Sequence, residues 1–129
     1  MDELTLRDQH VLRHIVVEYV DSAVPVGSET LVRKYNLGYS SATVRNIMAA
    51  LEARGYIYHP HTSAGRVPSH KGYRYFVERL MGAPDLPLEE QRRISHQFHQ
   101  VELDPDQCLS LAAAVLAQTT QNAALVSLP

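Results

Sequence analysis

Cysteine is almost absent from this chain, which has Cys108 as its one thiol in 129 residues. No disulfide can therefore form within the chain, and a reducing, cytoplasmic environment is expected. No apolar run approaches the roughly 18 residues that cross a bilayer. The acidic start Met1-Asp2-Glu3 is unlike a signal peptide. With 45% hydrophobic and 20% charged residues, we expect a folded protein that is not inserted in a membrane.

Signals of catalysis and metal binding are also missing. There is no glycine-rich phosphate loop after a strand, no nucleophile motif and no pair of carboxylates placed across a cleft. Three histidine pairs have a spacing that suits two metal ligands: His10 and His14, His59 and His61, His96 and His99. None has a nearby cysteine or carboxylate set that would complete a four-ligand zinc site. We therefore expect no enzyme, no cofactor and no metal.

The charge is distributed unevenly, although the whole chain carries a net charge of only −2. Residues 33–79 contain eight basic and two acidic residues, a net charge of +6, whereas the part from Gly82 onward carries −4. A basic block beside an acidic one is typical of a DNA-facing module joined to a part that does not touch DNA. A chance division of solvated faces is the alternative that composition leaves open.

Two helices are predicted first. The first begins after Thr5 as N-cap, with Asp8 completing a short capping box, and it ends before Pro25 and Gly27. Its apolar stripe is Leu12, Ile15, Val16, Tyr19 and Val20. Ser28 is predicted to cap the second, short helix, which ends at 36–38. The buried face of this helix is Leu31, Val32 and Tyr35.

A third helix is predicted from Ser41 to Arg54, capped by Ser40 or Ser41 and ended by Gly55. Its core stripe, at helical spacing, is Val44, Ile47, Met48 and Leu51. A strand at 56–59, a loop at 60–65 and a returning strand at 66–67 closed by Pro68 follow. Ser69 then caps a fourth helix, whose inward face is Tyr73, Phe76, Val77 and Leu80.

This order of elements predicts a mainly α fold: a winged helix-turn-helix domain at 1–81. Residues 82–103 are predicted as a linker with a connecting helix from Leu88 to about Val101. At 104–129 a second domain is expected to start, with Asp104 as the N-cap of a helix that runs to about Gln118. Residues 123–128 have the composition of a β-strand with no sheet to join, so we expect the chain to stop inside that domain.

The outer face of the third helix suits the major groove of DNA. Opposite the core stripe it carries alanines, which allow close approach, with Arg45 and Asn46 among them. Arginine pairs bidentately with guanine and asparagine with adenine. Ser41 and Thr43 lie in the first turn, where hydroxyls and backbone amides suit a phosphate. An ordinary solvated helix is the alternative.

The loop after the first strand is the candidate wing. His61, Thr62 and Ser63 can bond phosphates, and Arg66 could enter or flank a minor groove. A plain hairpin turn with a solvated arginine is the alternative interpretation. RNA binding is also open, since Tyr39, Tyr56 and Tyr58 could stack on bases, and so is a protein-interaction role, although the basic block argues against the latter.

Several motifs together resemble the N-terminal part of the heat-inducible transcription repressors of the HrcA family. They are Glu18-Tyr19, Pro25-Val26-Gly27-Ser28, Tyr35-Asn36-Leu37-Gly38, Ser41-Ala42-Thr43-Val44-Arg45-Asn46-Ile47-Met48, Leu51-Glu52, Gly55-Tyr56, His61-Thr62-Ser63-Ala64-Gly65-Arg66-Val67-Pro68 and Gly72-Tyr73-Arg74. One departure is Ile47, where family members commonly carry Asp. The ending at 122–126 is similar to the first strand of the family's second, GAF-like domain.

The resemblance implies a cytoplasmic, homodimeric repressor of chaperone operons in the stress response. Its operator would be CIRCE, an inverted repeat in double-stranded DNA, and a GroEL-type chaperonin would keep it active until heat stress diverts the chaperonin. Carried onto this sequence, the resemblance assigns DNA reading to Ser41, Thr43, Arg45, Asn46 and the wing's Arg66.

Overall fold

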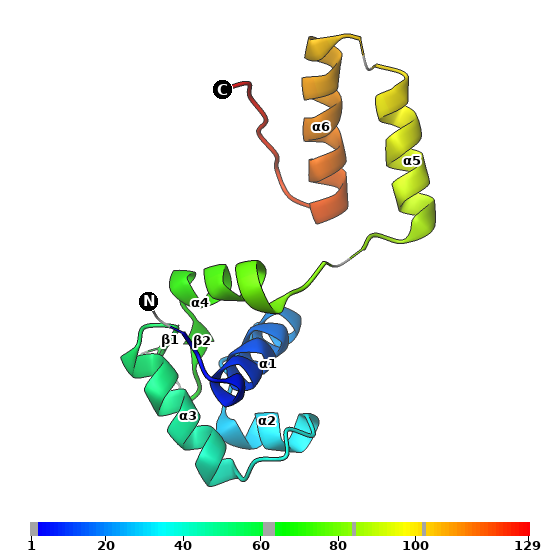
Figure 1. Ribbon diagram of the computed structural model, residues 1–129. Helices are drawn as coiled ribbons and strands as arrows, with labels where there is room; N and C mark the ends of the chain where they lie inside the picture. Colours follow the sequence, from blue (N-terminus) through cyan, green and yellow to red (C-terminus); the bar gives the residue numbers. More distant parts are fainter. Residues whose placement is uncertain (1–2, 61–63, 84, 102) are drawn as a thin grey trace. The chain divides into compact units, whose positions relative to one another are not determined.

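The computed structural model describes residues 3–60, 64–83, 85–101 and 103–129. Within them the chain divides into two compact units, Met1–Ala83 and Pro84–Pro129, which are described separately (Figure 1). The elements are α1 (Leu6–Ser22), α2 (Ser28–Lys34), α3 (Ser41–Ala53), β1 (Ile57–Tyr58), β2 (Val67–Pro68), α4 (His70–Tyr75), the π-helical turn η1 (Phe76–Leu80), α5 (Leu88–His99) and α6 (Pro105–Thr120). Among the described helices, none has the length and apolar character to cross a membrane.

Helix α1 supplies the centre of the first unit's core. Thr5 and Asp8 form the predicted capping box, and the helix ends at Ala23, whose φ is 58°. Leu12, Ile15 and Val16 are buried as predicted. Val20 is 68% exposed, contrary to the prediction, because it lies on the opposite side of the helix from the buried Val11.

Helix α2 differs from the prediction at its start. Gly27 occupies the N-cap position, without a side chain to bond the helix, and Ser28 is the first helical residue. Leu31 is fully buried, but Val32 is 36% exposed, since in a seven-residue helix only one narrow side meets the core. Glycine is tolerated as an N-cap nearly as well as serine, which explains why the helix still begins there.

Helix α3 is the best-predicted element. The Ser40 side chain caps it by accepting a hydrogen bond from the Thr43 backbone N–H at 3.1 Å. All four residues of the predicted core stripe, from Val44 to Leu51, are buried. Arg54 is the C-cap, and Gly55 follows with a φ of 84°, a conformation that favours glycine.

The first wing strand is shorter than predicted, and the second is shifted by one residue. Pro68 lies inside β2, paired with Ile57, instead of closing the strand. Proline fits there because β2 has a partner on one side only, so a missing N–H can face away from the ladder. Arg66 is bridged to Val26, with Val26 N–H donating to Arg66 O at 2.8 Å and Arg66 N–H donating to Val26 O at 2.9 Å.

Helix α4 is held against the wing by a very close approach. Ser69 caps it as predicted, accepting from the Gly72 N–H at 3.1 Å. A Cβ on Gly72 would lie 2.1 Å from the Tyr56 carbonyl oxygen. From Phe76 the helix continues as a π-helical turn, and its wider i→i+5 bonding rotates Val77 outward, where it is 56% exposed instead of buried as predicted.

In the second unit, α5 and α6 pack against each other. The Asp104 carboxylate caps α6 as predicted, accepting from the backbone N–H groups of Asp106 and Gln107. Helix α5 ends at His99, two residues before the expected Val101. The β-strand predicted at 123–128 does not form, because strand geometry needs a hydrogen-bonded partner and the described residues give it none.

One charged side chain is buried among the apolar residues of the first unit. Glu18, on α1, is 4% exposed; its Oε1 lies 2.7 Å from Lys34 Nζ and its Oε2 accepts from the Tyr35 hydroxyl at 2.9 Å. The hydrogen bond from Lys34 and that from Tyr35 lower the pKa of Glu18 below its ordinary 4.5, against the opposing effect of burial. Glu18 therefore anchors the end of α2 to α1 as an ionised group.

We expect Gly72→Ala to lower the free energy of unfolding by about 2–3 kcal/mol, since the added methyl must displace the backbone of Tyr56, the residue before β1. Urea unfolding measures this change. The matched control is Gly27→Ala, where no atom lies within 4 Å of the new Cβ; it should cost less than about 1 kcal/mol. Equal stability of the two variants would contradict the close approach of α4 to β1.

We expect Glu18→Gln to lower the melting temperature at pH 7 and to lower it by less at pH 3. The folded-state pKa of Glu18 is depressed, so its contribution to stability is present above about 4.5 and is lost as the pH falls through the folded pKa. Thermal unfolding of both proteins at the two pH values tests this. Glu78→Gln, which breaks the exposed pair with Arg74, is the control and should change little. A melting-temperature gap that is independent of pH would count against an ionised Glu18.

Candidate nucleic-acid interface

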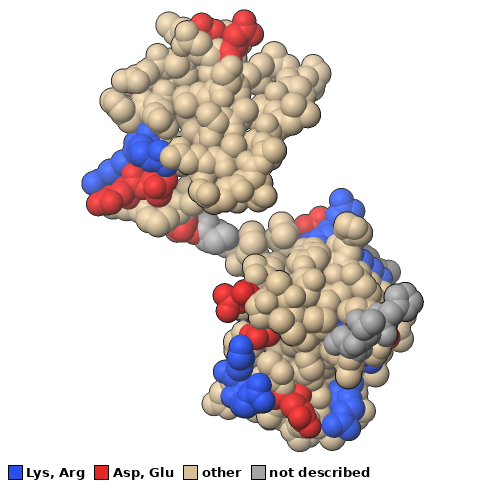
Figure 2. All heavy atoms as spheres, turned by 180° about the vertical axis from the view of Figure 1, so that it is seen from behind, with Lys and Arg blue, Asp and Glu red and all other residues tan. Residues whose placement is uncertain are grey.

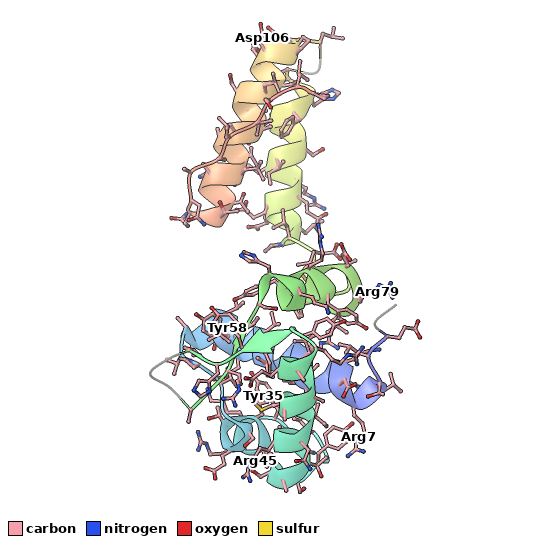
Figure 3. The ribbon with its side chains drawn as sticks, turned by 90° about the vertical axis from the view of Figure 1, so that its left-hand side faces the viewer. Arg7, Tyr35, Arg45, Tyr58, Arg79 and Asp106 are labelled. Carbon is pink, nitrogen blue, oxygen red and sulfur yellow. The ribbon has the colours of Figure 1, made fainter. Side chains whose placement is uncertain are left out.

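The face of α3 that points away from the core is small and largely uncharged. Ala42, Ala49, Ala50 and Ala53 are exposed on it, as are Arg45 and Asn46. Helix α3 lies in front in Figure 3, which labels Arg45 toward its N-terminal end. A helix with such a face can approach a flat or grooved partner closely, because only two long side chains project from it.

Shallow hollows lie on both sides of α3, so that the helix stands between them as a ridge. The hollow on the α2 and wing side, of about 460 Å³, is lined by Arg45, Ala49, Glu29 and Gly65, among others. On the α1 side a hollow of about 430 Å³ is lined by Thr43, Asn46, Arg7 and Asp8, among others. The predicted reading residues Arg45 and Asn46 therefore lie on opposite flanks of one ridge.

Half of the basic block is already engaged by the protein's own carboxylates. The pairs are Lys34 with Glu18, Arg54 with Asp8 at 3.9 Å, Arg66 with Glu52, and Arg74 with Glu78 at 3.6 Å. Figure 2 accordingly shows the basic side chains of the first unit in separate groups with acidic ones between them. Arg45 has neither a hydrogen bond nor an ion pair within the described residues, so its guanidinium is available to a partner.

The two hydroxyls predicted to contact a phosphate, those of Ser41 and Thr43, have different environments in the first turn of α3. Thr43 Oγ1 accepts from Ser40 Oγ at 3.0 Å and stays close to the surface of the α1-side hollow. Ser41 Oγ is buried and has no hydrogen-bond partner among the described residues. In this conformation Ser41 offers a partner its backbone N–H, one of the amides that no intrahelical carbonyl satisfies, in place of its hydroxyl.

Arg66 joins the wing to α3. Its Nε donates to Glu52 Oε1 of α3, its Nη1 lies 2.7 Å from His59 Nδ1, and Nη1 also donates to the Ala64 carbonyl at 2.8 Å. The predicted wing residues His61, Thr62 and Ser63 lie outside the described residues. Within the described part of the wing, Arg66 thus has a structural function that its sequence position did not reveal.

Arg7 is a charged residue of the interface that no sequence pattern indicated. Its guanidinium carbon lies 5.1 Å from the centre of the Tyr39 ring, and it lines the same hollow as Thr43 and Asn46. Figure 3 shows Arg7 and Arg45 on the two sides of the N-terminal half of α3. Arg7 lies outside the basic block and no periodic spacing links it to α3, so its place beside the helix follows only from the fold.

The tyrosines proposed for base stacking are mostly unavailable. Tyr56 is 2% exposed and Tyr39 lies beneath Arg7, which leaves Tyr58, 53% exposed, as the open ring of the three. This arrangement weakens the RNA interpretation, which needs several accessible rings. Among the described residues no three His, Cys, Asp or Glu side chains are grouped so as to hold a metal ion.

The order of the helices, the short hairpin and the exposed third helix define a winged helix-turn-helix protein. A comparison with protein-family models found no match. Curated relatives do match: the heat-inducible transcription repressor HrcA of Chloroflexus aurantiacus is 56% identical over 126 residues, covering 98% of this chain and 34% of the relative. HrcA of Roseiflexus castenholzii is 56% identical over 127 residues, covering 98% and 35%.

The chain spans about a third of the length of the curated relatives it matches, and these matches are consistent with an N-terminal portion of HrcA. HrcA of a Mycobacterium species (strain KMS) is 52% identical over 119 residues, covering 92% of this chain and 34% of the relative. A crystal structure of a hypothetical protein at 2.2 Å resolution has a TM-score of 0.70 and 38% identity. That match covers 90% of this chain and 36% of the other.

We expect Arg66→Ala to loosen the wing from the rest of the unit. Removing the guanidinium leaves the partly buried Glu52 carboxylate unpaired, so the Val26 and residue-66 backbone amides should exchange with solvent about tenfold faster. Hydrogen exchange followed by NMR measures this rate. Arg74→Ala removes an exposed pair and serves as the control, with no expected change at either amide. Unchanged exchange in Arg66→Ala would contradict the anchoring role.

Proposed function

We propose that this chain is the DNA-binding part of a transcriptional repressor of heat-shock and chaperone operons. The observation that carries the proposal is the exposed face of α3, where Arg45 and Asn46 stand among alanines and make no side-chain hydrogen bond or ion pair within the described residues. The names of the curated relatives, heat-inducible transcription repressors, support the same function. The proposed target is an inverted-repeat operator, CIRCE, in double-stranded DNA.

Recognition would place α3 in the major groove. Arg45 would pair bidentately with a guanine and Asn46 with an adenine, while the alanines let the helix lie close to the base edges. Ser41 and Thr43 would contact a phosphate at the start of the helix, Ser41 through its backbone N–H. On the wing side, His61, Thr62, Ser63 and Arg66 are the proposed backbone contacts; for Arg66 this would require one guanidinium to serve both DNA and Glu52.

An inverted repeat has two-fold symmetry, so the proposed binding form is a homodimer with one α3 on each half-site. Residues 1–81 would form the DNA-binding domain, 82–103 the connection and 104–129 part of a second, GAF-like domain. A GroEL-type chaperonin is the proposed modulator of repression, in a cytoplasmic setting. These assignments rest on the resemblance to the repressor family and extend the function proposed for α3.

We expect Arg45→Ala to lose sequence discrimination without loss of folding. A bidentate contact to a base is worth about 1–3 kcal/mol, so binding to the inverted repeat should weaken roughly 5- to 150-fold for each base contact that the substitution removes. Binding to a scrambled duplex should change much less. Fluorescence anisotropy with the two labelled duplexes measures both affinities, and circular dichroism verifies the fold.

The matched control is Arg79→Ala, which removes an exposed arginine at a distance from α3 (Figure 3). It should bind both duplexes almost as the wild type does. Single-stranded RNA of equal length, added as a competitor, tests the alternative partner. Wild-type protein that prefers the RNA, or an Arg45→Ala protein with full preference for the inverted repeat, would contradict the proposed function.

A further inference from the structure

Arg7 and Tyr39 form a stacked pair at the edge of the α3 ridge. Arg7 lies in the first turn of α1, and Tyr39 lies in the turn between α2 and α3, one residue before the N-cap Ser40. The Tyr39 ring is half-buried and packs against the hydrophobic core, while its hydroxyl lies 3.4 Å from His10 Nδ1. The ring therefore gives the exposed Arg7 side chain a fixed support.

Stacking leaves the hydrogen-bonding edge of the guanidinium open. A cation–π contact with a ring face uses none of the N–H groups in a hydrogen bond to another polar atom, so they stay available to a phosphate. Within the described residues Arg7 has no ion pair, unlike Arg54 and Arg66. Because the side chain is already held, a ligand that binds it loses less conformational entropy than one that binds a free arginine.

We propose that Arg7 binds a phosphate of the DNA backbone on the α1 side of the recognition helix. This inference rests on the proposed function and adds to it a contact from outside the helix-turn-helix motif itself. A helix in the major groove lies between two sugar-phosphate backbones. The hollow lined by Arg7, Thr43 and Asn46 is the space beside α3 where one of these backbones would run.

The charges around the hollow agree with this function. Asp8 also lines it, but its carboxylate accepts from the Thr5 N–H and lies 3.9 Å from Arg54, so much of its negative charge is offset within the protein. The positive end of the α1 helix dipole adds to the charge of Arg7. On the opposite flank, the hollow beside Arg45 is lined by the acidic Glu29 and by Arg66, which is paired with Glu52.

The experiment measures operator affinity as a function of salt for the wild type, Arg7→Ala and Arg79→Ala. Removing one phosphate contact reduces the magnitude of the log–log salt slope by about 0.9 and weakens binding about eightfold at 0.1 M salt, for each Arg7 that touches the site. Arg7→Ala should show this effect on the inverted repeat and on a scrambled duplex alike, which leaves the ratio of the two affinities unchanged. Arg79→Ala controls for a general loss of charge.

Two Tyr39 variants test the effect of the ring beneath Arg7 separately from the effect of the Arg7 charge. Tyr39→Phe keeps the ring and should bind as the wild type does, whereas Tyr39→Leu keeps apolar packing but removes the stack, and should lose part of the affinity that Arg7→Ala loses. If the wild type binds the operator but Arg7→Ala has the same salt slope and affinity as Arg79→Ala, the inference about Arg7 is wrong and the proposed function is unaffected. A wild type that does not distinguish the inverted repeat from the scrambled duplex would overturn the proposed function instead.

Discussion

The packing of α3 against α1 is the constraint on which the rest of the first unit depends. Val44, Ile47, Met48 and Leu51 are buried in one cluster with the apolar side of α1, and this fixes the rotation of α3 about its axis. Once these four side chains face inward, helical geometry leaves the alanine face with Arg45 outside. The same burial that stabilises the fold therefore selects the surface that we propose to contact DNA.

The basic residues fall into two groups, according to whether they form ion pairs with the protein's own carboxylates. Lys34, Arg54 and Arg66 are held by carboxylates of the protein and join elements to one another, whereas Arg45 and Arg7 have no ion pair within the described residues and flank the ridge. The net charge of the basic block thus overstates the positive charge that is free to meet an external partner. On the face seen in Figure 2, the basic side chains stand in separate groups.

Local signals made α1, α3 and their caps predictable, since Thr5, Ser40 and the four-residue core stripe act within a turn or two of the chain. The features that were not predicted depend on partners distant in sequence. Pro68 enters the strand because Ile57 pairs with it, and the wing's Arg66 turns to Glu52. The position of Arg7 was not predictable for the same reason. The aromatic ring that it contacts, that of Tyr39, lies far from it in the sequence.

The pair of backbone hydrogen bonds between Val26 and Arg66 closes the chain into a loop that contains α2, α3 and β1. Forming this closure restricts every residue between its two ends, and its entropic cost is met only when the elements inside have packed. Helix α3 and the base of the wing should consequently order together. Partial unfolding that breaks the Val26–Arg66 bridge would disrupt both of the proposed DNA-contact surfaces at once.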